Sequence, residues 1–158
     1  MRFSALTLAA LAVALPLAVV SVSASAQTEI MQAQPTLPTI PLKIRTAAGV
    51  LHFRVELART GAQQEAGLMF RTAVPAHGGM LFPMQPEREA TFWMKNTVIP
   101  LDMLFIRRDG TIARITTAKE LTTSIDDSGE PVAAVLELGA GRAASYGIRE
   151  GDHVSWKR

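Results

Sequence analysis

The chain of 158 residues contains no cysteine. A protein without thiols has no disulfide, no thiol nucleophile, and no cysteine ligand for zinc or an iron–sulfur cluster. The folded state must therefore be held together by packing and hydrogen bonds.

Runs of basic residues are also missing. Lys and Arg number 16 against 14 Asp and Glu, for a formal net charge of +2 at pH 7. Proteins that bind nucleic acids carry clustered cations that follow the phosphates, so we expect no nucleic acid partner. Gly-rich phosphate loops, nucleophile elbows and H-E-x-x-H motifs are absent too. The three histidines, His52, His77 and His153, lack metal-ligand spacing, and we expect neither a metal nor a cofactor.

The one long apolar run lies at the N-terminus. Arg2 precedes an uncharged stretch at positions 6–20, and Ala24-Ser25-Ala26 follows it. This is the pattern of a secretory signal peptide, with cleavage before Gln27. A membrane anchor is the alternative, but the run is shorter than the ~20 apolar residues that span a bilayer. We therefore expect a periplasmic or secreted protein with no membrane span after cleavage.

The rest of the chain divides into a leader and one domain. Residues 27–41 carry Pro35, Pro38 and Pro41 among Gln and Thr, a composition typical of an extended, mobile segment. Residues 42–158 have the length of a single domain.

Short strands dominate the pattern of this domain. Residues 50–57 alternate between apolar and polar, as a strand with one buried face does. Thr60 and Gln63 form a capping-box pattern before a short helix, and Asp109-Gly110 predicts a two-residue type I′ hairpin turn. Residues 126–129 are expected to form a loop. The remaining strands are expected at 42–46, 80–84, 91–96, 101–107, 111–117, 132–138 and 152–156, with helices from 60 to about 68 and at 140–146. The predicted fold is mainly β, a single β-sandwich or partly closed barrel with two short helices.

Several strings in this domain resemble one known family. They are Gly67-Leu68-Met69-Phe70-Arg71, Gly79-Met80-Leu81-Phe82, Phe92-Trp93-Met94-Lys95-Asn96-Thr97, Pro100-Leu101-Asp102, Leu136-Glu137-Leu138 with Gly141, and Gly147 through Gly151-Asp152. From Pro41 to its end the chain is similar to the bacterial and archaeal family called domain of unknown function 192. The resemblance implies a compact β domain, often exported, with no agreed activity.

The segment from Phe92 to Asp102 contains the largest group of side chains that could bind a ligand. Lys95, Asn96 and Thr97 bring a cation, an amide and a hydroxyl to the end of a predicted strand, next to the aromatic ring of Trp93. Such a group could bind an anionic or amide-bearing ligand. The alternative is that Asn96, Thr97 and Asp102 only satisfy the backbone of a sharp turn.

Glu137 lies between Leu136 and Leu138 in an apolar strand. A carboxylate in such a place is rarely left unpaired, so one interpretation is an ion pair with Arg71 or Lys95. The other is a carboxyl group with a raised pKa that acts as a general acid or base.

Five methionines crowd the middle of the chain: Met69, Met80, Met84, Met94 and Met103. Thioethers bind Cu(I), but methionine is also the common filler of irregular cores. We expect these five to pack in the core.

These observations favour a binding or accessory module of the cell envelope, with an unknown small molecule or peptide as its partner. The candidate ligand-binding residues are Arg71, Trp93, Lys95, Asn96, Thr97, Asp102 and Glu137. Two other hypotheses remain open: an enzyme that uses Glu137 or Asp102 as acid or base, and a purely structural domain.

Overall fold

The computed structural model describes residues 29–157. The predicted signal peptide and cleavage site lie outside these residues. Within residues 29–157, no helix has both the length and the apolar character needed to cross a membrane.

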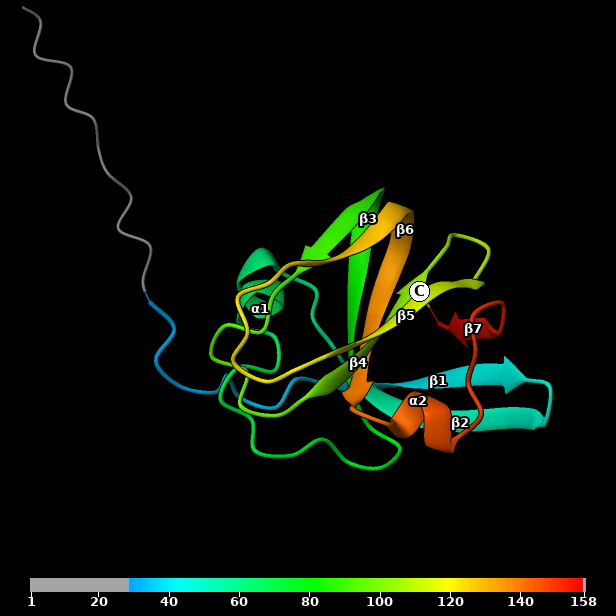
Figure 1. Cartoon of the computed structure of the whole chain (residues 1–158), viewed down its shortest axis with the longest axis horizontal. Coiled ribbons are helices and arrows are strands. Elements are labelled where there is room, and N and C mark those ends of the chain that lie inside the picture. Colours follow the sequence, from blue (N-terminus) through cyan, green and yellow to red (C-terminus); the bar gives the residue numbers. More distant parts are fainter. Residues whose placement is uncertain (1–28, 158) are drawn as a thin grey trace, which may run out of the picture.

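Seven strands form one sheet in the order β5-β4-β6-β3-β2-β1-β7 (Figure 1). All neighbouring strands pair antiparallel except β2 and β3, which pair in parallel. The strands are β1 (Thr39–Thr46), β2 (Gly49–Leu57), β3 (Met80–Phe92), β4 (Leu101–Ile106), β5 (Ile112–Ala118), β6 (Asp126–Gly139) and β7 (His153–Trp156). Helix α1 (Gly61–Ala66) follows β2, and α2 (Arg142–Ser145) follows β6. The prediction of a mainly β fold with two short helices is confirmed.

The two edges of the sheet approach each other. Thr111, just before β5, forms an antiparallel bridge with His153 of β7. The N–H of Val154 donates to the carbonyl of Gly110, and the N–H of Ile112 to that of Asp152, both at 2.8 Å. The sheet is therefore strongly curled and remains open along most of this seam, consistent with a partly closed barrel.

Each face of the sheet carries its own apolar core. Along β4 the residues alternate: Leu104 packs in one core, whereas Met103 and Phe105 pack in the other. The first core also includes Ala143 of α2, and the second includes Leu68, just after α1. All six residues of β4 are buried, because both faces of the strand are covered.

Helix α1 begins as the sequence predicts. The hydroxyl of Thr60 accepts from the N–H of Gln63 at 3.2 Å, and Oε1 of Gln63 accepts from the N–H of Thr60 at 3.1 Å. This reciprocal capping box satisfies two N–H groups at the start of the helix. Figure 1 shows α1 on the side of the sheet away from the β1–β2 hairpin.

Two predicted boundaries are wrong. The expected strands at 80–84 and 91–96 form one long bulged strand, β3, which ends at Phe92. The expected loop at 126–129 is the start of β6, where Asp126 and Asp127 pair with Phe92 and Thr91. The bulges shift the register twice, and this blurs the alternation by which a strand is recognised in a sequence.

The β4–β5 turn differs from the predicted type. The N–H of Gly110 donates to the carbonyl of Arg107 at 3.0 Å, and the N–H of Arg107 donates to the carbonyl of Thr111 at 2.9 Å. Only Gly110 has a positive φ, +92°, whereas a type I′ turn needs two such residues. The loop is therefore the three-residue hairpin with a glycine bulge. Thr111 donates its N–H to Oδ1 of Asp109 at 2.8 Å, which lowers the pKa of that carboxyl group.

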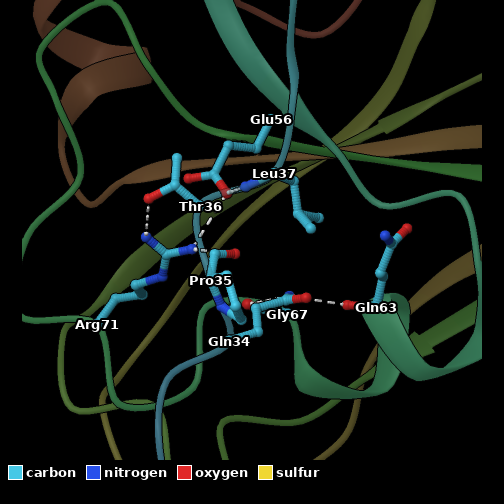
Figure 2. Close-up of polar contacts among 8 residues, drawn as sticks. All are labelled: Gln34, Pro35, Thr36, Leu37, Glu56, Gln63, Gly67 and Arg71. Carbon is cyan, nitrogen blue, oxygen red and sulfur yellow. Dashed lines mark hydrogen bonds and ion pairs between the residues drawn. The ribbon is translucent and has the colours of Figure 1, made fainter.

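The predicted leader packs against the domain, contrary to the expectation of a mobile segment (Figure 2). Nε2 of Gln34 donates to the carbonyls of Gln63 and Gly67, at 3.0 and 2.9 Å. The Gln63 carbonyl also accepts from the N–H of Gly67, the residue that ends α1, at 2.9 Å, so Gln34 holds the C-terminal end of the helix. The N–H of Leu37 donates to Oε2 of Glu56 at 2.6 Å. The sequence does not predict these contacts, because the Gln34 side chain belongs to no repeating apolar–polar pattern or known motif.

Candidate functional site

A cavity of about 230 Å³ opens between the end of α1, the second half of β3 and the start of the following segment. We call it the Glu137 cavity, because Glu137 of β6 lines it. Its apolar wall is formed by Leu68, Met69, Phe82, Met84, Phe92 and Trp93. Its polar lining is formed by Gln64, Glu65, Arg88, Glu89, Thr91, Thr97 and Glu137.

The sheet itself positions Glu137. Its cross-strand neighbours are Met80 on β3 and Met103 on β4, and residues opposite each other in a sheet project from the same face. Both methionines are fully buried members of the second core. The carboxyl group of Glu137 therefore lies among thioethers and aliphatic carbon. The polar groups nearest to it are those that line the cavity.

The Glu137 carboxyl group has no hydrogen bond or ion pair with any other side chain or backbone group among residues 29–157, and the residue is 5% exposed. Burial raises its pKa from 4.5 to about 8, because desolvation disfavours the charged form. At pH 7 about nine molecules in ten then carry the proton. A protonated carboxyl group presents one O–H donor beside one carbonyl acceptor.

Trp93 and Thr97 also line the cavity, as the sequence suggested. Trp93 is 49% exposed, and Nζ of Lys95 lies 5.4 Å from the centre of its ring. Lys95 thus contacts the Trp93 ring and is not one of the residues that line the cavity. Thr97 is buried, and its hydroxyl donates to the carbonyl of Lys95 at 3.4 Å.

Arg71 does not reach Glu137, so the predicted pairing of these two residues is wrong. Its guanidinium contacts Oε2 of Glu56 at 3.1 Å, and it also donates to the Thr36 hydroxyl and the Pro35 carbonyl, both at 3.4 Å (Figure 2). Nε of Arg71 is buried without a hydrogen bond among the residues described. Arg71 therefore ties the N-terminal segment to β2.

Asp102 has a structural role. Its two carboxyl oxygens accept from the Thr117 hydroxyl at 2.7 Å and from the N–H of Ala143 at 2.9 Å. Asp102 is fully buried and pairs with Leu138, one residue from Glu137. Adjacent residues of a strand face opposite sides of a sheet, so Asp102 lies away from the cavity. The Ala143 contact fixes the start of α2 against β4.

Asn96 belongs to a tight turn. Its φ is +58°, a left-handed conformation that asparagine tolerates better than most residues. Its carbonyl accepts from the N–H of Phe70 at 2.8 Å, and Nδ2 donates to the carbonyl of Ile30 at 3.4 Å. The turn alternative describes Thr97, whose hydroxyl donates to a carbonyl two residues earlier. The side chains of Asn96 and Asp102 instead form hydrogen bonds with segments far along the chain.

Sequence reasoning missed the rim of the cavity. Gln64 and Glu65 come from α1, and Arg88 and Glu89 come from the bulged part of β3. No motif marks them, because they meet only when α1 packs against the sheet.

The methionines pack as expected. Met80, Met84, Met94 and Met103 belong to the second core, and Met69 is buried at the cavity. Within residues 29–157, no three His, Cys, Asp or Glu side chains are grouped so that they could hold a metal ion.

Two solved structures resemble the whole domain. One, from Sinorhizobium meliloti 1021, is of a protein proposed to be a transcription regulator; it is 42% identical, with a TM-score of 0.74, and the match covers 78% of this chain and 97% of that one. The other, from Novosphingobium aromaticivorans DSM 12444, is of a protein of unknown function; it is 40% identical, with a TM-score of 0.75 and coverage of 84% and 97%. No curated protein matches the chain. Residues 42–156 match the family described as an uncharacterized ACR, and the chain thus belongs to the domain of unknown function 192 family.

Proposed function

We propose that this protein is a binding module whose ligand is a small molecule with an apolar body and a carboxamide group, held in the Glu137 cavity. The observation that carries the proposal is the Glu137 carboxyl group, buried beside the cavity without a partner among residues 29–157. Because Glu137 lines the cavity and has no protein partner there among the residues described, a ligand in the cavity can form hydrogen bonds with its carboxyl group.

The carboxamide follows from the protonation of Glu137. A neutral carboxyl group offers an O–H and a carbonyl oxygen side by side, and a primary amide or lactam offers the complementary carbonyl and N–H. Two parallel hydrogen bonds can then form. Thr97 lines the same cavity, and its hydroxyl, which donates to the Lys95 carbonyl, can still accept a hydrogen bond.

The body of the ligand should be apolar and compact. Phe82, Phe92 and Trp93 provide aromatic surface, and Met84 and Leu68 fill the space between them. A volume of about 230 Å³ lies below the range of pockets that hold drug-sized molecules, roughly 300–1,000 Å³. A single ring with one polar substituent matches this size.

An anionic ligand, the other class that the sequence suggested, fits this cavity poorly. The lining holds three carboxyl groups, on Glu65, Glu89 and Glu137, and one cation, on Arg88. The cations expected to hold an anion are elsewhere, because Arg71 contacts Glu56 and Lys95 contacts Trp93.

We place this binding outside the cytoplasm, as an accessory function of the cell envelope. The support is the apolar run followed by Ala24-Ser25-Ala26, which has the form of a signal peptide. Mass spectrometry of the protein recovered from the periplasm or medium tests this proposal. A mature chain that begins at Gln27 is expected, and a chain that retains Met1 in the cytoplasm contradicts export.

Three probes of similar size test the ligand class: benzamide, benzoate and benzylammonium. Isothermal titration at about pH 7 should show binding of benzamide at least tenfold tighter than of either ion. Glu137→Met, which removes both hydrogen-bonding groups but keeps the volume, should abolish that binding. Glu120→Gln, at an exposed residue outside the cavity, is the control and should retain it. Tighter binding of an ion, or binding of none of the three, would reject the proposal.

The second candidate function is general-acid catalysis by Glu137. A general acid must hold its proton at the working pH, and burial keeps the pKa of Glu137 high enough for that. Asp102, the other residue considered for this role, has both carboxyl oxygens engaged by the fold. Incubation of the probes with the protein, followed by NMR, separates the two functions: turnover that Glu137→Gln abolishes favours the enzyme, and unchanged probe favours the binding module.

A further inference from the structure

We propose a second binding site, for an organic anion with a planar apolar body, in a cleft beside β7. The cleft has a volume of about 510 Å³ and lies between the end of β2, the middle of β3, the β4–β5 turn and β7. We call it the β7 cleft. Its volume falls within the range typical of small-molecule sites.

The charge of the β7 cleft is positive. Arg59, Arg108 and Lys157 line it, together with one carboxylate, Glu87. Glu87 contacts Arg108 at 3.4 Å. The side chains of Arg59 and Lys157 have no partner within residues 29–157. Cations that share a hollow raise the local concentration of anions there, and arginine can hold a carboxylate or phosphate through two parallel hydrogen bonds.

The wall of the cleft is apolar and partly aromatic. Trp156 is half-buried, and Leu57 and Met84 are buried beneath the cleft, with Pro83 beside them. A planar ring can contact the exposed part of the tryptophan, which a simple inorganic ion would leave in water. The combination selects an anionic head group attached to a planar apolar body.

The β7 cleft and the Glu137 cavity favour opposite charges. Met84 lines both, while three carboxyl groups line the cavity and three cations line the cleft. The cations of the cleft, Arg59, Arg108 and Lys157, come from three separate parts of the chain. The sequence suggested an anionic ligand at Arg71 and Lys95, whereas the cations of this cleft are other residues, which no local motif marks.

The two tryptophans of the chain allow a direct test. In a Trp93→Phe background, Trp156 is the only tryptophan and reports on the β7 cleft. Phenyl phosphate and phenylacetate are the anionic probes, and benzyl alcohol and inorganic phosphate are the controls for charge and for ring. We expect a saturable change in Trp156 fluorescence with at least one anionic probe, and much weaker binding of both controls. The relative affinities of the two anionic probes then show whether the cleft prefers a phosphate or a carboxylate head group.

A charge-matched pair of variants tests the role of the cations. Arg59→Gln should weaken binding of the better probe about tenfold, since it removes a charge-assisted hydrogen bond. Arg149→Gln removes the same charge from an exposed residue outside the cleft and should leave binding unchanged. Isothermal titration of the same proteins covers the case in which the fluorescence does not respond. Absence of binding by both methods, equal binding of benzyl alcohol, or equal affinity of the two variants overturns the proposal.

Discussion

Replacement of Glu137 by glutamine should make the protein more stable, and increasingly so as the pH rises. Glutamine has nearly the shape of the protonated carboxyl group and stays neutral at every pH. The wild-type residue must lose its proton in the unfolded chain above pH 4.5, but it keeps the proton in the folded chain up to about pH 8. The difference between wild type and variant therefore isolates this one ionisation.

The magnitude follows from the two pKa values. Below pH 4.5 both states hold the proton, so the ionisation has no effect on stability. Between pH 4.5 and about 8 only the unfolded chain releases it, and the free energy of unfolding falls by about 1.4 kcal/mol per pH unit. Above pH 8 the contribution is constant. The whole window amounts to about 5 kcal/mol, of which about 3 kcal/mol is lost by pH 7. This is a large part of the 5–15 kcal/mol that a typical domain has.

Urea denaturation of both proteins at about pH 5, 7 and 9 measures the effect. The free energy of unfolding of Glu137→Gln should rise relative to wild type by about 3 kcal/mol or more across this series. Glu65→Gln, at the exposed rim of the cavity, is the control and should differ from wild type by less than about 0.5 kcal/mol at pH 7. A difference between Glu137→Gln and wild type that stays constant with pH would refute the reasoning.

Three further substitutions test other parts of the structure by the same denaturation assay. Gly110→Val should destabilise by at least about 2 kcal/mol, because φ is +92° and an added Cβ would lie 2.5 Å from the carbonyl oxygen of Val154; an unchanged midpoint would contradict the observed turn. Gln34→Ala should cost about 1–2 kcal/mol through the loss of two hydrogen bonds to α1, whereas a mobile leader predicts no change. Lys95→Met should cost less than about 1 kcal/mol, since its partner is the half-exposed ring of Trp93; a loss of several kcal/mol would show that a buried carboxylate depends on it.

The fold class could be predicted because its signals are local. The alternation in β2 buries Phe53, Val55 and Leu57 as expected, and the Thr60 capping box starts α1 where the sequence places it. The long strands β3 and β6 were harder to recognise, because their bulges break the alternation. The alternation of apolar and polar side chains and the capping of a helix depend on a few neighbouring residues. A bulge depends on how the strand pairs with the strand opposite, which the local sequence does not show.

The site could be predicted only in part. Glu137 stands out in the sequence because a carboxylate interrupts an apolar strand, and the structure does bury it beside a cavity. Its lack of a partner could not be foreseen, because Arg71 is equally free in the sequence to pair with Glu56. Asp102 is close to the other candidates along the chain, yet the alternation of β4 places it on the opposite face of the sheet. Local spacing indicates which residues share a strand, and the tertiary packing decides which ones meet.

The carboxyl carbon of Glu137, followed by ¹³C NMR against pH, tests the central claim most directly. The signal can be assigned by its loss in Glu137→Gln. In the free protein the titration midpoint should lie at about 8, and benzamide should raise it further, because a ligand that binds only the neutral carboxyl group stabilises that form. A midpoint close to 4.5, or one that benzamide leaves unchanged or lowers, would contradict a neutral Glu137 as the group that holds the ligand.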